Sequence, residues 1–191
     1  MIEGDQPLGP EAERALAEAA RIAALHILRH RSADDVDRQE RATLLRSLLE
    51  GSTPADDAAE QLGIEPGSEC AVVAFRLLIH DDAELDLKRE RTVDLVTVYC
   101  EAFRRRAVCV AIGRDVYALL PSLAPESRVL ALATDIAAHA AAALATPLVV
   151  GVGSTVPTLA LAPRSRQEAD RVLDVIETST PGTVAHIDEV R

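Results

Sequence analysis

Aromatic residues and lysines are scarce in this 191-residue sequence. Aromatic side chains make up 2% of it, tryptophan is absent, and Lys88 is the only lysine. The formal net charge is -11 at pH 7, because 31 acidic residues outnumber 20 basic ones. Nucleic-acid binding depends on cations that displace counterions from phosphates, and single-strand binding adds aromatic stacking. The sequence as it stands therefore makes a poor nucleic-acid binder.

Long apolar runs are missing as well. No stretch approaches the roughly 20 apolar residues that span a bilayer, and residues 1–5 lack the basic flank of a secretory signal. A hydrophobic content of 48% is nevertheless enough to bury a core. We therefore expect a folded, cytoplasmic protein with no membrane partner.

Metal and redox motifs are also lacking. Cys70, Cys100 and Cys109 are an odd number without C-x-x-C spacing, which predicts reduced, buried thiols. His26 and His30 lie one helical turn apart, but the sequence offers them no acidic or cysteine partner. The remaining histidines are isolated in sequence: His80, His139 and His186. We expect neither a metal site nor a cofactor.

The N-terminal third is helical by pattern. Residues 11–31 contain no glycine or proline and are rich in alanine and leucine, and residues 32–35 resemble a capping box that opens a second helical stretch ending at Gly51. Small and aliphatic residues recur at helical spacing and predict a seam for pairing with a second copy, although packing on the chain's own domain is the alternative. The predicted dimer seam consists of Leu16, Ala20, Ala23 and Ile27, continued by Leu44 and Leu48.

From residue 51 onward the pattern alternates between helices and strands. A short helix follows Thr53, with Pro54 at its first position, and ends at Gly63. Strands are predicted at 70–79, 108–112, 116–120, 148–153 and 184–187, and helices at 86–105, 125–145 and 164–178, with Leu87 on the inner side of the first of these. This order predicts an α+β, ferredoxin-like βαββαβ domain over 51–191, preceded by long N-terminal helices over 1–50.

Several stretches of the chain resemble parts of known families. The hairpin Gly113, Arg114, Asp115, Val116 and Tyr117 resembles, in degraded form, the GGDEF hairpin of nucleotide cyclases. Residues 150–154 and 164–169 resemble the "GVG … S-Y-R-E-A" stretch of the GGDEF-like domain in PucR/CdaR-type transcriptional regulators. Residues 41–51 resemble the "L-L-x-x-L-L-x-G" helix that precedes this domain, and residues 8–31 resemble the last helix of a GAF-type sensor.

The resemblance implies a domain that lies between a sensory module and a C-terminal helix-turn-helix. The sequence up to Arg191 shows no helix-turn-helix pattern and no basic recognition helix. We therefore expect DNA binding only through a domain that is missing from this chain.

The residues needed for cyclase chemistry are largely replaced. Phosphoryl transfer by two metal ions needs converging carboxylates, which the resemblance places on the first strand and in the hairpin. Here the strand reads Phe75-Arg76-Leu77, and Val116 stands at the place of the hairpin glutamate. Asp115 remains, while Asp81 and Asp82 are expected to begin a loop or cap the next helix.

These observations predict a non-catalytic regulatory and dimerisation fragment of a PucR/CdaR-like transcriptional regulator. It would form a homodimer through its N-terminal helices. One alternative is a ferredoxin-like module that binds a small-molecule effector in the groove around Gly113–Asp115. Another is a divergent nucleotide cyclase.

Overall fold

The computed structural model describes residues 36–104, 106–121 and 126–190. The chain divides into two compact units, residues 1–40 and 41–191, and the fold described here is that of the second. The predicted helix over 11–31, His26 and His30, and the seam residues Leu16, Ala20, Ala23 and Ile27 lie outside the described residues.

A mixed five-stranded sheet forms the centre of the second unit, in the order β2-β3-β1-β4-β5. Its strands are β1 (Cys70–Leu77), β2 (Val108–Ile112), β3 (Asp115–Pro121), β4 (Leu148–Val152) and β5 (Val184–His186). β1 is antiparallel to both β3 and β4, β2 and β3 form a hairpin, and β5 runs parallel to β4. The predicted βαββαβ order, followed by one further helix and strand, is confirmed.

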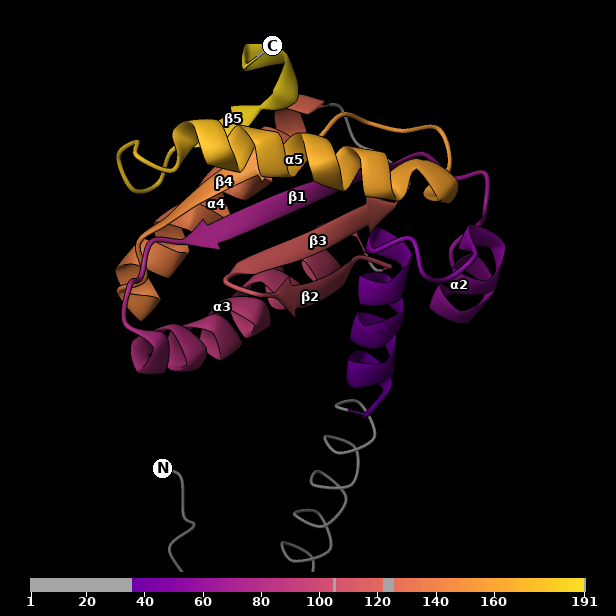
Figure 1. Ribbon diagram of the computed structural model, residues 1–191, viewed down its shortest axis with the longest axis horizontal. Helices are drawn as coiled ribbons and strands as arrows, with labels where there is room; N and C mark the ends of the chain where they lie inside the picture. Colours follow the sequence, from indigo (N-terminus) through magenta and orange to yellow (C-terminus); the bar gives the residue numbers. More distant parts are fainter. Residues whose placement is uncertain (1–35, 105, 122–125, 191) are drawn as a thin grey trace, which may run out of the picture. The chain divides into compact units, whose positions relative to one another are not determined.

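Helices cover both faces of the sheet (Figure 1). One face packs against α3 (Asp82–Phe103) and α4 (Glu126–Leu144). The other packs against α5 (Ala162–Ile176), α2 (Ala55–Leu62) and the helical residues 41–49, which we call the linker helix. Because both faces are buried, β1 reads as an almost continuous apolar run, which is typical of a central strand.

Two helix boundaries differ from the sequence-based expectation. α3 begins at Asp82, where Asp81 caps it by accepting a hydrogen bond from the Glu84 N–H at 2.8 Å, as expected for an aspartate before a helix. The prediction that Leu87 faces inward is wrong, since this residue is 52% exposed. α2 begins at Ala55 with Pro54 as its N-cap, so the predicted cap at Thr53 is one residue too early.

The linker helix belongs to the core of the second unit. Leu48 is only 2% exposed and packs in the same cluster as Leu45 and Leu49, and Leu44 is partly buried against it. Leu48 is therefore unavailable to a second copy, so the predicted continuation of the dimer seam is wrong at Leu48, while at Leu44 it stays a prediction. The unit begins at Arg41, whereas the sequence analysis placed the boundary after Glu50.

α4 is long and apolar enough to cross a membrane by length and composition alone, although the sequence analysis found no such run. In the structure this helix packs on the sheet through Val129, Ile136 and Ala140, which are at most 2% exposed. The apolar residues on this face of the helix are therefore explained by their place in the core.

Candidate functional site

The β2–β3 hairpin places its five predicted residues on opposite sides of the sheet. Gly113 has a φ of 62°, a left-handed conformation that glycine adopts without steric cost, and it forms the turn with Arg114. Val116 is fully buried toward α3 and α4, whereas Tyr117 packs in the cluster on the α5 side. Because side chains alternate along a strand, Asp115 lies on the same side as Tyr117.

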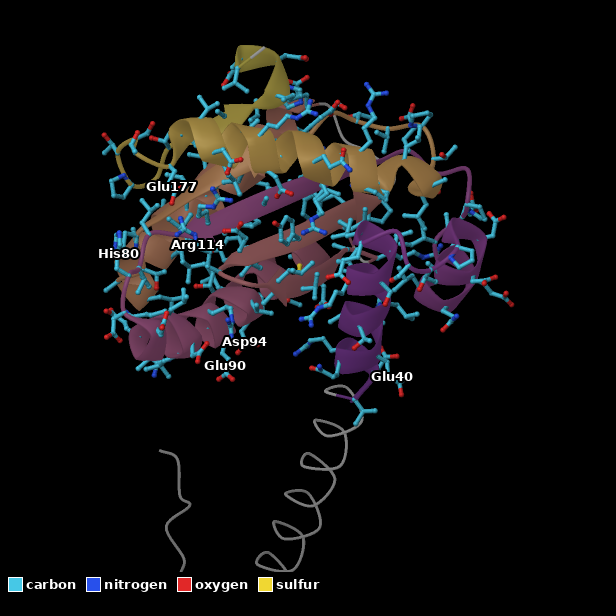
Figure 2. The ribbon with its side chains drawn as sticks, in the orientation of Figure 1. Glu40, His80, Glu90, Asp94, Arg114 and Glu177 are labelled. Atoms are coloured by element: carbon cyan, nitrogen blue, oxygen red, sulfur yellow. The ribbon has the colours of Figure 1, made fainter. Side chains whose placement is uncertain are left out.

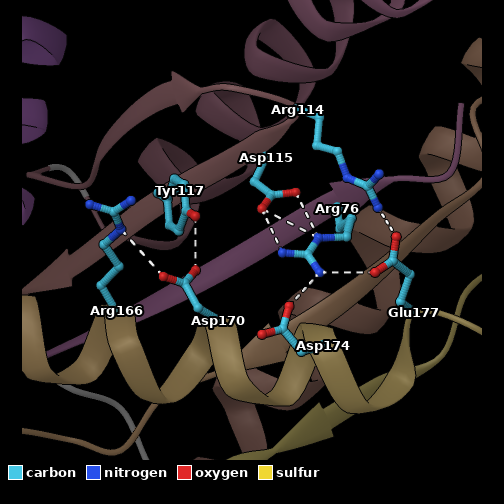
Figure 3. Close-up of polar contacts among 8 residues, drawn as sticks. All are labelled: Arg76, Arg114, Asp115, Tyr117, Arg166, Asp170, Asp174 and Glu177. Atoms are coloured by element: carbon cyan, nitrogen blue, oxygen red, sulfur yellow. Dashed lines mark hydrogen bonds and ion pairs between the residues drawn. The ribbon is translucent and has the colours of Figure 1, made fainter. Parts of the chain in front are cut away.

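Arg76 of β1 is the centre of the site. It lies directly opposite Asp115 in the β1–β3 register, so the two side chains meet on the α5 face. The Arg76 guanidinium donates from Nε to Asp115 Oδ1 at 3.0 Å and from Nη2 to Asp115 Oδ2 at 2.9 Å. Its Nη1 donates to Asp174 Oδ1 at 2.8 Å and to Glu177 Oε2 at 3.4 Å (Figure 3). One arginine thus holds three carboxylates.

The pair at the centre is largely shielded from water. The side chains of Arg76 and Asp115 are 11% and 9% exposed, whereas Asp174 and Glu177 are 68% and 40% exposed. The hydrogen bond to Asp115 raises the pKa of Arg76 and outweighs the effect of burial, so the guanidinium stays charged. A bidentate arginine–carboxylate pair of this kind is strong and geometrically specific.

Arg114 extends this network at the surface. It is 40% exposed and forms an ion pair with Glu177, toward which it points (Figure 2). Glu177 therefore contacts both Arg76 and Arg114, and the turn of the hairpin is tied to the end of α5. We call Arg76, Arg114, Asp115, Asp174 and Glu177 the arginine cluster.

A second polar chain connects the hairpin to the linker helix. The Tyr117 hydroxyl donates to Asp170 Oδ1 at 2.8 Å, and burial, with this hydrogen bond, raises the pKa of Tyr117. The Arg166 guanidinium lies 4.8 Å from the centre of the Tyr117 ring and donates to the carbonyl oxygen of Leu49 at 3.2 Å. From the other direction, Arg46 donates to the carbonyl oxygen of Ala111 at 2.7 Å.

The glycine- and serine-containing stretch of the family resemblance packs α5 against the sheet. The Ser165 hydroxyl donates to the carbonyl oxygen of Ser154 at 2.8 Å and accepts from the Val72 N–H at 2.9 Å. A Cβ at Gly153 would lie 2.0 Å from the backbone oxygen of Ser165, so only glycine allows this close approach. Glu168 accepts hydrogen bonds from the N–H and hydroxyl groups of Ser154. These contacts fix α5 against the sheet.

A cleft lies between one side of α5 and the C-terminal residues 187–190. Its volume is about 540 Å³, within the range of small-molecule sites. Arginine, glutamine and glutamate side chains line one part and aliphatic side chains line the rest. The lining residues are Arg164, Gln167, Glu168, Arg171, Val175, Ile187 and Val190.

The family model for the GGDEF-like domain matches residues 49–175. This match covers more than half of the chain, and the chain therefore belongs to the GGDEF-like domain family. A search of curated proteins found no match.

Crystal structures of GGDEF domains are similar in fold. The GGDEF domain of YfiN (TpbB) from Pseudomonas aeruginosa is 16% identical, with a TM-score of 0.48 over 69% of this chain and 87% of that one. The GGDEF domain of DgcB from Caulobacter crescentus, in complex with c-di-GMP, is 13% identical, with a TM-score of 0.49 over 70% of this chain and 82% of that one.

Sequence reasoning found the hairpin but missed the partners of Asp115. Arg76 entered only as the residue that replaces an acid, although a lone arginine within an apolar strand is itself a signal that a buried anion lies nearby. Asp170 and Asp174 on α5 and Glu177, its C-cap, recur at spacings of four and three, which places them on one helix face. This row of acidic residues was the sequence feature from which the acidic partners of Arg76 on α5 could have been predicted.

Proposed function

We propose that this domain is a non-catalytic regulatory module of a PucR/CdaR-type transcriptional regulator, in which a separate helix-turn-helix domain binds DNA. The family match supports the GGDEF-like part of this proposal. The arrangement around Arg76 supports the non-catalytic part, and the contacts of the linker helix support a role in transmitting conformational signals.

The position of the Arg76 guanidinium carries the proposal. Both oxygens of Asp115 are bound to it, at 3.0 and 2.9 Å, so they are already neutralised by a cation of the chain itself. A Mg²⁺ ion on Asp115, about 4 Å from the guanidinium, would meet a repulsion of about 8 kcal/mol at an effective dielectric constant of about 20. Val116, which stands at the place of the hairpin glutamate, offers no oxygen ligand. Arg76 would thus exclude the metal that cyclase chemistry requires.

The linker helix is suited to transmit movement to the hairpin. Arg46 reaches from this helix to β2, and Arg166 reaches from α5 to the carbonyl oxygen of Leu49 at the end of the linker helix. Leu45 and Leu48 fix the same helix in the core. A rotation or shift of the linker helix would therefore disturb β2 and α5 together. This coupling is the physical basis for a signal that passes from a sensor through the helix to the domain.

Incubation of the protein with GTP and Mn²⁺, followed by chromatography of the nucleotides, tests the non-catalytic part. We expect GTP to remain unconverted, with the same result for Asp115→Asn. Formation of cyclic di-GMP or pyrophosphate by the wild-type protein, lost in Asp115→Asn, would show that the domain is a cyclase and would refute the proposal.

Light scattering tests the proposed homodimer. We expect the wild-type chain to be a dimer and the double variant Leu16→Asp, Ile27→Asp to be a monomer, because charges on the seam oppose its burial. Val98→Asp is the matched control, since Val98 is 63% exposed on α3 and its replacement should leave the dimer intact. A double variant that remains dimeric would exclude this seam.

The effector-binding alternative is favoured by one observation, the cleft on α5. Its arginines and aliphatic side chains suit a small molecule that combines a carboxylate with an apolar part. The hairpin groove, where the sequence placed this site, is instead filled by mutually paired charges. Benzoate and octanoate serve as probes: either should raise the melting temperature of the wild-type protein, and the increase should be lost in Arg171→Ala. An unchanged melting temperature would count against this alternative.

A further inference from the structure

Three potential metal ligands converge where α4 begins and β5 ends. Glu126 is the first residue of α4, His186 is the last residue of β5, and Asp188 lies in the short helix η2 (Ile187–Glu189). One ligand atom from each lies within 4.8 Å of the other two. In the sequence His186 is isolated, because its partner Glu126 is distant in the chain. The fold brings them together.

The two distances from His186 to the carboxylates are those of ligands around one ion. His186 Nδ1 lies 3.3 Å from Glu126 Oε1 and 3.5 Å from Asp188 Oδ2. Zinc binds imidazole nitrogen and carboxylate oxygen at about 2.0 to 2.2 Å, so ligand atoms at tetrahedral positions lie about 3.4 Å apart. The imidazole is 5% exposed, whereas the two carboxylates are 54% and 59% exposed and open to solvent. An ion could therefore reach the site from the surface.

The surroundings of His186 Nδ1 place three possible ligand atoms side by side. The Asp188 N–H donates a long hydrogen bond of 3.3 Å to this nitrogen. One carboxylate oxygen of Glu126 and one of Asp188 face the same atom. An ion held between the two carboxylates and the imidazole would replace the long backbone contact.

We propose that Glu126, His186 and Asp188 form a binding site for a divalent transition-metal ion, with Zn²⁺ as the ion that fits best. A ligand set of one imidazole and two carboxylates suits Zn²⁺ and Co²⁺ better than Mg²⁺, which prefers oxygen ligands and near-ideal octahedral geometry. Three protein ligands leave a fourth position for water. The ion would join the start of α4 to the end of β5, two elements that lie far apart in the sequence.

Isothermal titration calorimetry of the metal-free, untagged chain with ZnCl₂ tests this proposal. We expect one equivalent of Zn²⁺ to bind. Glu126→Gln, which removes one exposed ligand and does not threaten the fold, should weaken binding at least about tenfold. His186→Ala should abolish it. His139→Ala is the matched control, because this exposed histidine contacts the Asp135 carbonyl oxygen and the Tyr99 ring and is not one of the three proposed ligands, so its replacement should leave the affinity unchanged.

Co²⁺ gives an independent readout. A bound Co²⁺ should show the intense visible absorption of a tetrahedral site in the wild-type protein and in His139→Ala, and lose it in Glu126→Gln. Zn²⁺ affinity weaker than about 1 mM would overturn the proposal. So would binding that Glu126→Gln leaves unchanged, because the ion would then be held elsewhere.

Discussion

Replacement of Arg76 by leucine tests the energetic role of the arginine cluster. The substitution keeps an apolar stem in the strand but leaves the Asp115 carboxylate, 9% exposed, without its cation. Removal of one partner of a buried ion pair costs about 3–5 kcal/mol, because the remaining charge is buried and unpaired.

Two further variants separate this effect from a general loss of packing. The double variant Arg76→Leu, Asp115→Leu has no unpaired buried charge, so we expect it to regain most of the stability that Arg76→Leu loses. Arg114→Leu is the matched control, because Arg114 and Glu177 are each 40% exposed and such surface pairs contribute about 0–1 kcal/mol. The free energy of unfolding, measured by urea denaturation with circular dichroism, should fall by about 3–5 kcal/mol in Arg76→Leu. A loss below about 1 kcal/mol, or a double variant less stable than Arg76→Leu, would refute the reasoning.

Three other predictions concern the packing of α5 and the buried groups. Gly153→Ala should lower the free energy of unfolding by at least about 2 kcal/mol, because its Cβ would collide with the Ser165 backbone, whereas Gly67→Ala meets nothing within 4 Å and should be neutral; equal effects in urea denaturation would contradict this. Burial disfavours the ionised Glu168, but hydrogen bonds from Ser154 and Arg164 outweigh it and hold the pKa of Glu168 below its usual 4.5. The contribution of Glu168 to stability is therefore present above pH 4.5 and lost as the pH falls through the lowered pKa. The wild-type protein should lose more stability than Glu168→Gln on acidification. Parallel pH profiles of the two proteins would contradict this prediction. Burial raises the pKa of Cys70 to about 12, and all three cysteines are buried, so a thiol reagent such as DTNB should react only after unfolding; rapid reaction of the native protein would contradict the burial.

The order of strands and helices was predictable because it depends on local patterns. The apolar run from Cys70 predicts a central strand, and a glycine between two β-rich runs predicts the hairpin at Gly113. Which residues of a helix face inward was harder to predict. Leu87 fits an inward position by spacing alone, yet it is exposed in the structure. The burial of Leu48 in its own domain likewise depends on how the linker helix is placed against the sheet.

The arginine cluster was only half predictable. Arg76 contacts Asp115, 39 residues away, and Asp174, 98 residues away, so neither pair shows in a local pattern. The β1–β3 register brings Arg76 opposite Asp115, and the packing of α5 adds Asp174. The same holds for Glu126 and His186, which meet only because β5 runs beside β4 and ends near the start of α4. Such groups need the assembled fold.

We propose that Arg76 occupies the place where a catalytic metal would have to bind. A crystal structure of the chain soaked with GTP and Mn²⁺, with anomalous scattering to locate manganese, tests it most directly. The account predicts that Arg76 stays bound to Asp115, as at 2.9 Å here, with no anomalous peak at that carboxylate. A manganese ion coordinated by Asp115, with the Arg76 side chain displaced, would contradict it.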